Sequence, residues 1–176
     1  MPQHHEIVPF LYENGQLRLL DQRALPNAEI WLTLSSLREA ADAIADMAVR
    51  GAPAIGCVAA WGMAFAAREI AARCLDDKSA REELQNAARM LTATRPTAVN
   101  LAWAVERQLQ AAADAPCAQW PERLEAQALR IAAEDRFACE AIGRHGLDAL
   151  LPGALSLLTH CNAGALATAG FRQPQA

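Results

Sequence analysis

Hydrophobic residues recur at helical spacing through most of the chain after residue 36. The pattern predicts five helices, at about 37–50, 53–74, 79–92, 97–113 and 121–145. The second helix is apolar nearly all round in its first half, which is typical of a helix at the centre of a fold. Its uncharged run, Ala52 to Ala67, is slightly too short to span a bilayer and is rich in Gly and Ala. We therefore expect a buried core helix and no membrane partner.

Three short apolar stretches alternate with turn signals before the first helix. Ile7–Tyr12 and Leu17–Asp21 flank an Asn-Gly pair, which predicts a β-hairpin. A third short strand is expected at about Ala28–Leu34. Near the other end, Ala154–Thr159 predicts a strand that runs through a tight turn into an Ala-rich helix. One strand and one helix cannot bury their own faces, so this strand either joins the hairpin or begins a domain whose remainder is missing.

The predicted fold is therefore mainly α with a small N-terminal β-hairpin or sheet. Residues 1–150 are expected to form the hairpin and a helical domain. Residues 151–176 are expected to be the start of a truncated α/β domain, as its first βα unit. Two Ser-x-x-Glu capping boxes, at Ser36–Glu39 and Ser79–Glu82, mark the beginnings of the first and third helices.

Composition and charge exclude several functions. The net charge is −4, the pI is about 5.6 and no stretch is strongly basic, so a nucleic-acid partner is not expected. The five cysteines are odd in number and form no CxxC pair, which argues against a disulfide framework and a zinc site: Cys57, Cys74, Cys117, Cys139 and Cys161. Reduced thiols and the lack of a signal-peptide pattern favour a cytoplasmic protein. No metal or cofactor is expected.

Three loops that precede helices are the candidate sites for chemistry. Arg50-Gly51-Ala52-Pro53 and Thr94-Arg95-Pro96-Thr97 each place an arginine before a Pro-marked helix start, where unpaired backbone N–H groups bind anions such as phosphate. Cys161 lies at a strand end and beside a helix N-terminus, which would favour its thiolate. The alternatives are ordinary ones: surface arginines, and a buried thiol that acts as a small hydrophobe. Trp31, Trp61 and Trp103 are expected in the core.

Four sequence blocks resemble the motifs of the methylthioribose-1-phosphate isomerase family. Asp21-Gln22-Arg23-Ala24-Leu25-Pro26 is similar to its N-terminal signature, and the other blocks are Val49–Gly56, Arg95–Leu101 and Leu158–Gly170. They occur in the family's order and cover the chain from about residue 7 to Phe171. The family shares its fold with regulatory subunits of a translation-initiation guanine-exchange factor and with ribose-1,5-bisphosphate isomerase. His160-Cys161-Asn162-Ala163-Gly164 favours the methylthioribose branch.

The resemblance implies an intramolecular aldose–ketose isomerase of methionine salvage, converting 5-methylthioribose 1-phosphate to 5-methylthioribulose 1-phosphate. By this resemblance Cys161 is the catalytic cysteine, and Arg50, Gly51, Ala52 and Arg95 match the phosphate-binding loops. The family's second half is a Rossmann-like domain that supplies a catalytic Asp and is associated with dimer formation. A chain of 176 residues that lacks this half is expected to be inactive alone. The alternative is a non-catalytic helical regulatory or interaction module, or a protein like ribose-1,5-bisphosphate isomerase.

Overall fold

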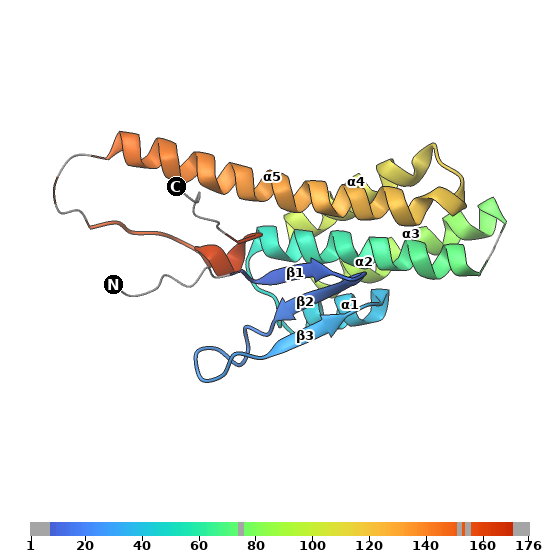
Figure 1. Ribbon diagram of the computed structural model, residues 1–176, viewed down its shortest axis with the longest axis horizontal. Helices are drawn as coiled ribbons and strands as arrows, with labels where there is room; N and C mark the ends of the chain where they lie inside the picture. The colour runs from blue at the N-terminus through green and yellow to red at the C-terminus, as the bar shows by residue number, and fades with distance from the viewer. Residues whose placement is uncertain (1–7, 74–75, 151–152, 154–155, 171–176) are drawn as a thin grey trace.

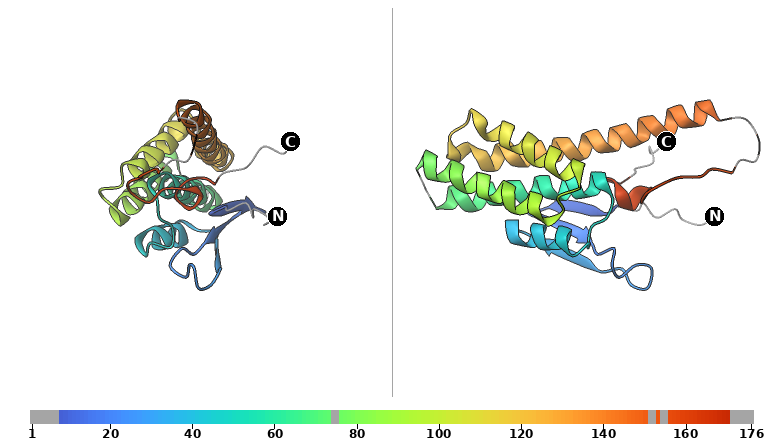
Figure 2. Two further views of the ribbon diagram at one scale, coloured as in Figure 1. Left: turned by 90° about the vertical axis from the view of Figure 1, so that its left-hand side faces the viewer. Right: turned by 180° about the vertical axis from the view of Figure 1, so that it is seen from behind.

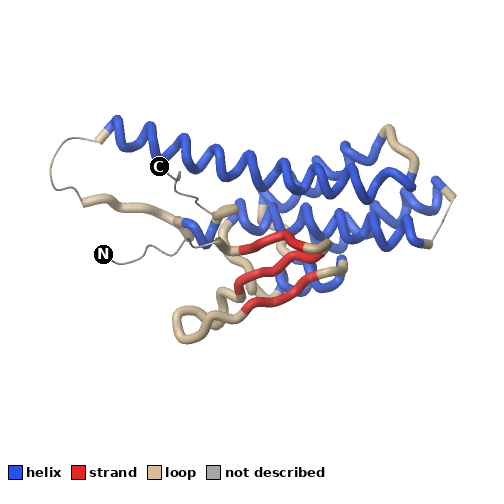
Figure 3. Tube along the Cα trace, viewed as in Figure 1, coloured by secondary structure: helices blue, strands red, loops and turns tan. Residues whose placement is uncertain are grey.

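The computed structural model describes residues 8–73, 76–150, 153 and 156–170. The chain is about 63% helical and has one small three-stranded antiparallel sheet, so the predicted fold class is confirmed. Figure 1 and Figure 3 show a bundle of long helices with the sheet against one side. The helices are α1 (Leu37–Ala45), α2 (Ala52–Ala72), α3 (Asp77–Thr94), α4 (Val99–Ala113) and α5 (Trp120–Ala149), with short 3₁₀ turns η1 (Cys117–Gln119) and η2 (Ala165–Ala167).

The sheet has the strand order β1-β2-β3, with β1 at Phe10–Glu13, β2 at Gln16–Leu20 and β3 at Trp31–Leu34. Asn14 and Gly15 both have positive φ, 52° and 79°, as the predicted two-residue hairpin turn requires. Leu17 and Leu19 point into the core and are fully buried. The ring of Tyr12 stacks on Trp61 of α2 with centroids 3.8 Å apart, so the sheet packs directly on the central helix.

Helix α2 is the core of the molecule. Every residue from Ala54 through Ala67 is buried, and α2 contacts all four other helices. Its length and composition would suffice to cross a membrane, yet 83% of its most apolar window is buried inside the protein. Burial within the bundle accounts for its apolar sequence, which agrees with the predicted core helix.

The helix boundaries differ from the predicted ones in two places. Helix α1 ends at Ala45, well before Gly51, because Met47 adopts a positive φ of 58° and turns the chain. Its predicted capping box at Ser36 and Glu39 is present. The predicted box at Ser79 is wrong: Asp76 caps α3 by accepting hydrogen bonds from the backbone N–H groups of Lys78 and Ser79.

The predicted strand at Ala154–Thr159 does not form in the part that the structure describes. Residues 154–155 lie outside the described residues, and 156–160 have no regular secondary structure. Between Cys161 and Gly170, where the described chain ends, the three-residue turn η2 is present in place of the predicted helix. A strand needs a hydrogen-bonding neighbour, and the described chain offers none beside this segment. The first βα unit of a second domain is therefore not assembled here.

Gln108 provides a test of the packing among the core helices. It is fully buried on α4, and its Nε2 donates to the carbonyl oxygens of Ala60 on α2 at 2.9 Å and Leu124 on α5 at 3.0 Å. Gln108→Ala removes both of these interhelical hydrogen bonds and opens a cavity, so we expect the free energy of unfolding to fall by about 2–4 kcal/mol. Urea denaturation measures this change. The exposed neighbour Gln110 is the control, and equal effects of Gln108→Ala and Gln110→Ala would contradict the packing described.

Candidate functional site

The helices of the bundle run antiparallel to their neighbours in sequence, and this brings two helix N-termini to one end. Figure 1 and Figure 2 show that α2 and α4 both begin at the end where η2 and the loop between β2 and β3 lie. Gly56, in the second turn of α2, lies against the first turn of α4, since a Cβ there would be 2.9 Å from the carbonyl oxygen of Asn100. Two of the three predicted loops therefore meet.

Both helices begin without a side-chain cap. The N-cap of α2 is Gly51, with φ 96°, and the N-cap of α4 is Ala98, and neither offers a side-chain acceptor to the helix. Ala52 is the first residue of α2 and Pro53 the second, one position later than the sequence predicts. The backbone N–H groups in the first turns therefore keep their capacity to bind an anion.

Arg50 and Arg95 immediately precede these helix starts. Arg50 is exposed and Arg95 is partly buried at the C-terminal cap of α3. Among the described residues, neither guanidinium forms an ion pair or a side-chain hydrogen bond. Several other arginines of the chain are paired, such as Arg23, Arg68 and Arg107. Two unpaired cations beside two uncapped helix N-termini form an arrangement suited to a phosphate group.

Cys161 lies on the described segment that leads to this end of the bundle. The residue is exposed and has φ 69°. Within the described residues 162–170 the longest helical element is the three-residue η2, so the expected activation of the thiol by a helix dipole has no basis there. The predicted position beside a strand end is also wrong, because residues 156–160 are not a strand.

The segment after Cys161 is held against the helical domain. Gln22 donates from Nε2 to the carbonyl oxygen of Leu166 at 2.8 Å. Ala167 packs so closely on Gly51 that a Cβ at Gly51 would lie 2.3 Å from the Cα of Ala167. Ala169 donates its backbone N–H to Asp135 on α5 at 2.6 Å. We call Gly164–Gly170 the anchored segment, and it joins the third predicted loop to the first.

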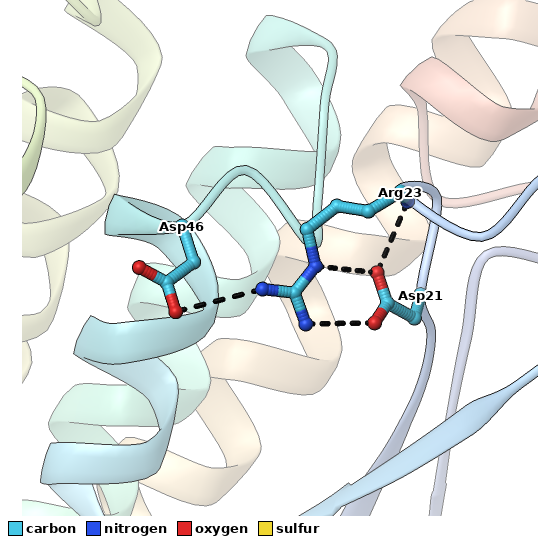
Figure 4. A network of polar contacts seen from close by, with 3 residues as sticks. All are labelled: Asp21, Arg23 and Asp46. Atoms are coloured by element: carbon cyan, nitrogen blue, oxygen red, sulfur yellow. Dashed lines mark hydrogen bonds and ion pairs between the residues drawn. The ribbon is translucent and has the colours of Figure 1, made fainter.

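A network at Asp21 holds the loop that carries Gln22. Figure 4 shows Asp21 accepting hydrogen bonds from the backbone N–H, Nε and Nη2 of Arg23, while Asp46 of the α1 end contacts the same guanidinium at 3.5 Å. Hydrogen bonds from the Arg23 side chain lower the pKa of Asp21, although burial opposes this shift. The backbone N–H of Gln22 donates to the carbonyl oxygen of Ala48. This bond joins the loop after β2 to the segment that leads into Arg50, two residues after Ala48.

A cleft of about 240 Å³ lies between α2, α4 and α5. Its apolar wall includes Pro53 and Ile131, and its polar lining includes Asn100 and Asp135. Trp103 also lines the cleft and is 47% exposed, so the expectation that it belongs to the core is wrong. Trp61 is buried, as predicted.

The thiols of the described chain lie in different environments. Cys57, in the wall of the cleft, and Cys117 are buried, as expected for reduced structural thiols, and burial raises the pKa of Cys57 far above its ordinary range. Cys139 is partly exposed and Cys74 lies outside the described residues. In the described ranges no group of three or more His, Cys, Asp or Glu side chains is placed to hold a metal ion.

Comparison with known proteins gives one family and one fold. The model of the Initiation factor 2 subunit family matches residues 48–173. The chain is 44% identical over 163 residues to a methylthioribose-1-phosphate isomerase of Geobacter sulfurreducens, covering 91% of this chain and 46% of that protein. It is 49% identical over 165 residues to one from Anaeromyxobacter sp., covering 93% and 45%. The chain thus spans about half the length of these curated relatives.

Two solved structures share the fold. The 5-methylthioribose 1-phosphate isomerase from Pyrococcus horikoshii OT3 aligns with a TM-score of 0.81 at 35% identity, over 92% of this chain and 45% of that chain. The delta subunit of the translation initiation factor eIF-2B from A. fulgidus aligns with a TM-score of 0.78 at 39% identity, over 93% and 47%. Both therefore match this chain along nearly its whole length and match about half of their own.

Gly51 provides a test of the close contact between α2 and the anchored segment. Gly51→Ala introduces a side chain at φ 96° that collides with the backbone of Ala167. We expect a loss of about 1–3 kcal/mol in the free energy of unfolding and faster amide exchange in residues 165–169. Gly143→Ala is the control, because a Cβ there meets nothing within 4 Å. That helical substitution should stabilise by about 0.5–1 kcal/mol, and a Gly51→Ala variant as stable as Gly143→Ala would refute the contact.

The Asp21 network predicts a pH dependence of stability. Because the folded pKa of Asp21 is lowered, its contribution is fully present above the unfolded pKa of about 3.9 and is lost as the pH falls through the folded value. Asp21→Asn should therefore be less stable than the parent at pH 7, and the difference should shrink below about pH 3.9. Urea unfolding between pH 7 and pH 3 measures it. Asp46→Asn, at the exposed outer contact, should change stability little at any pH.

Proposed function

Because the chain belongs to the Initiation factor 2 subunit family, we propose that it forms the sugar-phosphate-binding half of a methylthioribose-1-phosphate isomerase. One observation carries the proposal. The uncapped N-termini of α2 and α4 lie at the same end of the bundle, each beside an arginine that has no ion-pair partner among the described residues. Relatives and a solved structure that bear the isomerase name match the chain over more than nine-tenths of its length.

The phosphate of the substrate binds at these two helix starts. Arg50 and Arg95 supply charge-assisted hydrogen bonds, and the backbone N–H groups of the first turns supply directed donors. Ala52 is exposed and carries no polar side chain, so the ligand can approach the backbone of the first turn of α2 there, while Gly51 allows the close contact with Ala167 that brings η2 to this helix start. This assignment gives each of the four substrate-binding residues a physical role.

Cys161 serves the reaction as an acid/base group. Aldose–ketose isomerisation opens the sugar ring and moves a hydrogen from C2 to C1, while the phosphate on C1 stays attached. Such a transfer requires one group that accepts a proton from carbon and one that supports the oxygen where charge develops. Cys161 would supply one of these groups, and the other belongs to the half of the enzyme that this chain does not span. The chain alone therefore binds the sugar phosphate without turning it over. A homodimer and a cytoplasmic location remain predictions.

A second candidate function is a regulatory module that binds a sugar phosphate or a protein without chemistry. The match to the delta subunit of eIF-2B, at 39% identity, favours considering it. The two candidates differ at His160-Cys161-Asn162, which the isomerase assignment uses and a purely regulatory module does not need.

Calorimetric titration with 5-methylthioribose 1-phosphate tests the binding part of the proposal. We expect saturable binding that inorganic phosphate competes for, and that weakens by about 10- to 100-fold in Arg50→Ala and Arg95→Ala, because each removes a charge-assisted hydrogen bond. The control is Arg123→Ala, an exposed arginine in the first turn of α5 at the opposite end of the bundle. Equal affinity of the Arg95 and Arg123 variants would contradict the phosphate site.

Alkylation of Cys161 tests its placement in the same site. Bound 5-methylthioribose 1-phosphate should slow the reaction of Cys161 with iodoacetamide, as followed by peptide mass spectrometry, and should leave Cys139 unchanged. Protection should be absent in Arg95→Ala at the same ligand concentration. Tight binding of the ligand with no protection of Cys161 in the parent chain would favour the regulatory alternative.

A further inference from the structure

Asp135 binds the anchored segment through its carboxylate. The residue lies on α5 and is partly buried, and its Oδ2 accepts the backbone N–H of Ala169 at 2.6 Å. Among the described residues it forms no ion pair with Lys, Arg or His, whereas its neighbour Glu134 pairs with Arg107. The carboxylate is therefore committed to a single backbone N–H of the anchored segment.

Burial makes this placement costly. Desolvation raises the pKa of Asp135, and the hydrogen bond from Ala169 and the nearby charge of Arg136 only partly oppose it. The residues one and two turns earlier on the same face of α5 are apolar. They are Ile131, in the wall of the cleft, and Ala128, in the core. A carboxylate at such a position lowers stability unless the bond that it makes matters.

That bond fixes the far side of the anchored segment. Gln22 holds Leu166 and Gly51 touches Ala167 on the side of the sheet and α2, but neither contact restrains Thr168–Gly170. Asp135 holds Ala169, and Cys139, one turn further along α5, has a hydrogen bond with the Thr168 side chain. The segment is thus bridged between α2, through Gly51, and α5, through Asp135.

The position of Cys161 depends on this bridge. No backbone hydrogen bond joins residues 156–163 to any other described residue. The first residue after Cys161 with a hydrogen bond to another element is Leu166, in the anchored segment, five positions later. If Ala169 were released, the contacts of Leu166, Ala167 and Gly170 would remain, and the segment would lose its charge-assisted hydrogen bond to α5.

We propose that Asp135 is a positioning residue, which acts through the Ala169 N–H and the anchored segment to hold Cys161 at the end of the bundle where α2 begins. The proposal rests on the proposed function for the role of Cys161, but the restraint itself does not require catalysis. Asp135 does not touch the substrate or the reacting atoms.

Amide exchange tests the restraint directly. In Asp135→Ala we expect the Ala169 amide to exchange about 10- to 100-fold faster, because a hydrogen bond to a charged group is lost. Asp135→Asn keeps an oxygen acceptor and should preserve most of the protection. Asp148→Ala, an exposed aspartate in the last turns of α5, is the control and should leave Ala169 unchanged. Equal exchange in Asp135→Ala and Asp148→Ala would overturn the proposal.

The location of Cys161 needs a second readout that loss of stability alone does not change. Spin labels on Cys161 and on Ala102→Cys, an exposed position of α4, report the distance between the loop and the bundle in a Cys74→Ser, Cys139→Ser background. Measured well below the melting temperature, the distance distribution should broaden in Asp135→Ala and return toward the parent in Asp135→Asn. An unchanged distribution in Asp135→Ala would overturn the proposal, even if Ala169 exchanged faster.

The two proposals fail in distinguishable ways. If the substrate does not protect Cys161 in the parent chain, the proposed function fails, while the distance measurement still decides the role of Asp135. If protection occurs in the parent and Asp135→Ala leaves the Cys161 distance unchanged, the positioning role fails and the proposed function stands. If Asp135→Ala does not fold, Asp135→Asn decides the matter. A parent-like Ala169 exchange rate together with an unchanged Cys161 distance supports the role of the acceptor oxygen. Loss of Ala169 protection with an unchanged Cys161 distance contradicts it.

Discussion

The burial of α2 is the constraint on which the rest of the structure depends. A helix whose residues from Ala54 through Ala67 are all buried must be covered on every side, and the other four helices and the sheet provide that cover. Small residues allow the close approach, as at Gly56, where the α4 backbone would collide with any side chain. Because the covering helices run antiparallel in sequence, α2 and α4 necessarily begin at the same end. The candidate site is a consequence of how the core is packed.

The sheet and the loop after it connect this core to the site. Arg68 of α2 donates to the Gly15 carbonyl oxygen at 2.6 Å and also bonds Glu125 on α5 at 2.5 Å, so the hairpin and α5 are fixed to α2. At the other end of the sheet, Asp21 and Arg23 shape the loop that presents Gln22 to Leu166. Hydrogen bonds at both ends of the sheet thus tie the hairpin, α5 and the segment at Leu166 to the central helix and its surroundings.

Sequence alone predicts the parts that local chemistry dictates. The Asn-Gly hairpin turn, the Ser36 capping box and the all-round apolar helix each follow from residue type and spacing, and the structure confirms them. The early end of α1 at Ala45 could not be predicted, because it comes from the positive φ of Met47, and a positive φ on a methionine has no sequence signal. The strand at Ala154–Thr159 was predicted from a short apolar run, but a strand also requires a partner, which no local pattern reveals.

In the candidate site, too, local patterns could be predicted from the sequence and long-range contacts could not. Arg50, Gly51, Ala52 and Arg95 are predicted from sequence because Arg, Gly and Pro before a helix form a local pattern, and their role in binding stays a prediction. Gln22 and Asp135 could not be assigned contacts from sequence, because their partners in the anchored segment are 144 and 34 positions away. The strand and helix predicted on either side of Cys161 are wrong, and its catalytic role stays a prediction. Long-range hydrogen bonds, and not periodicity, determine where its loop lies.

The central claim is that the starts of α2 and α4 together hold the phosphate of a sugar phosphate. Backbone amide shifts of the chain during titration with 5-methylthioribose 1-phosphate test it most directly. The account predicts that the largest changes fall together on Gly51, Ala52, Ala54, Val99 and Asn100, with one shared dissociation constant. Changes confined to another surface, such as the exposed face of α3 around Arg81 and Arg89, would contradict it.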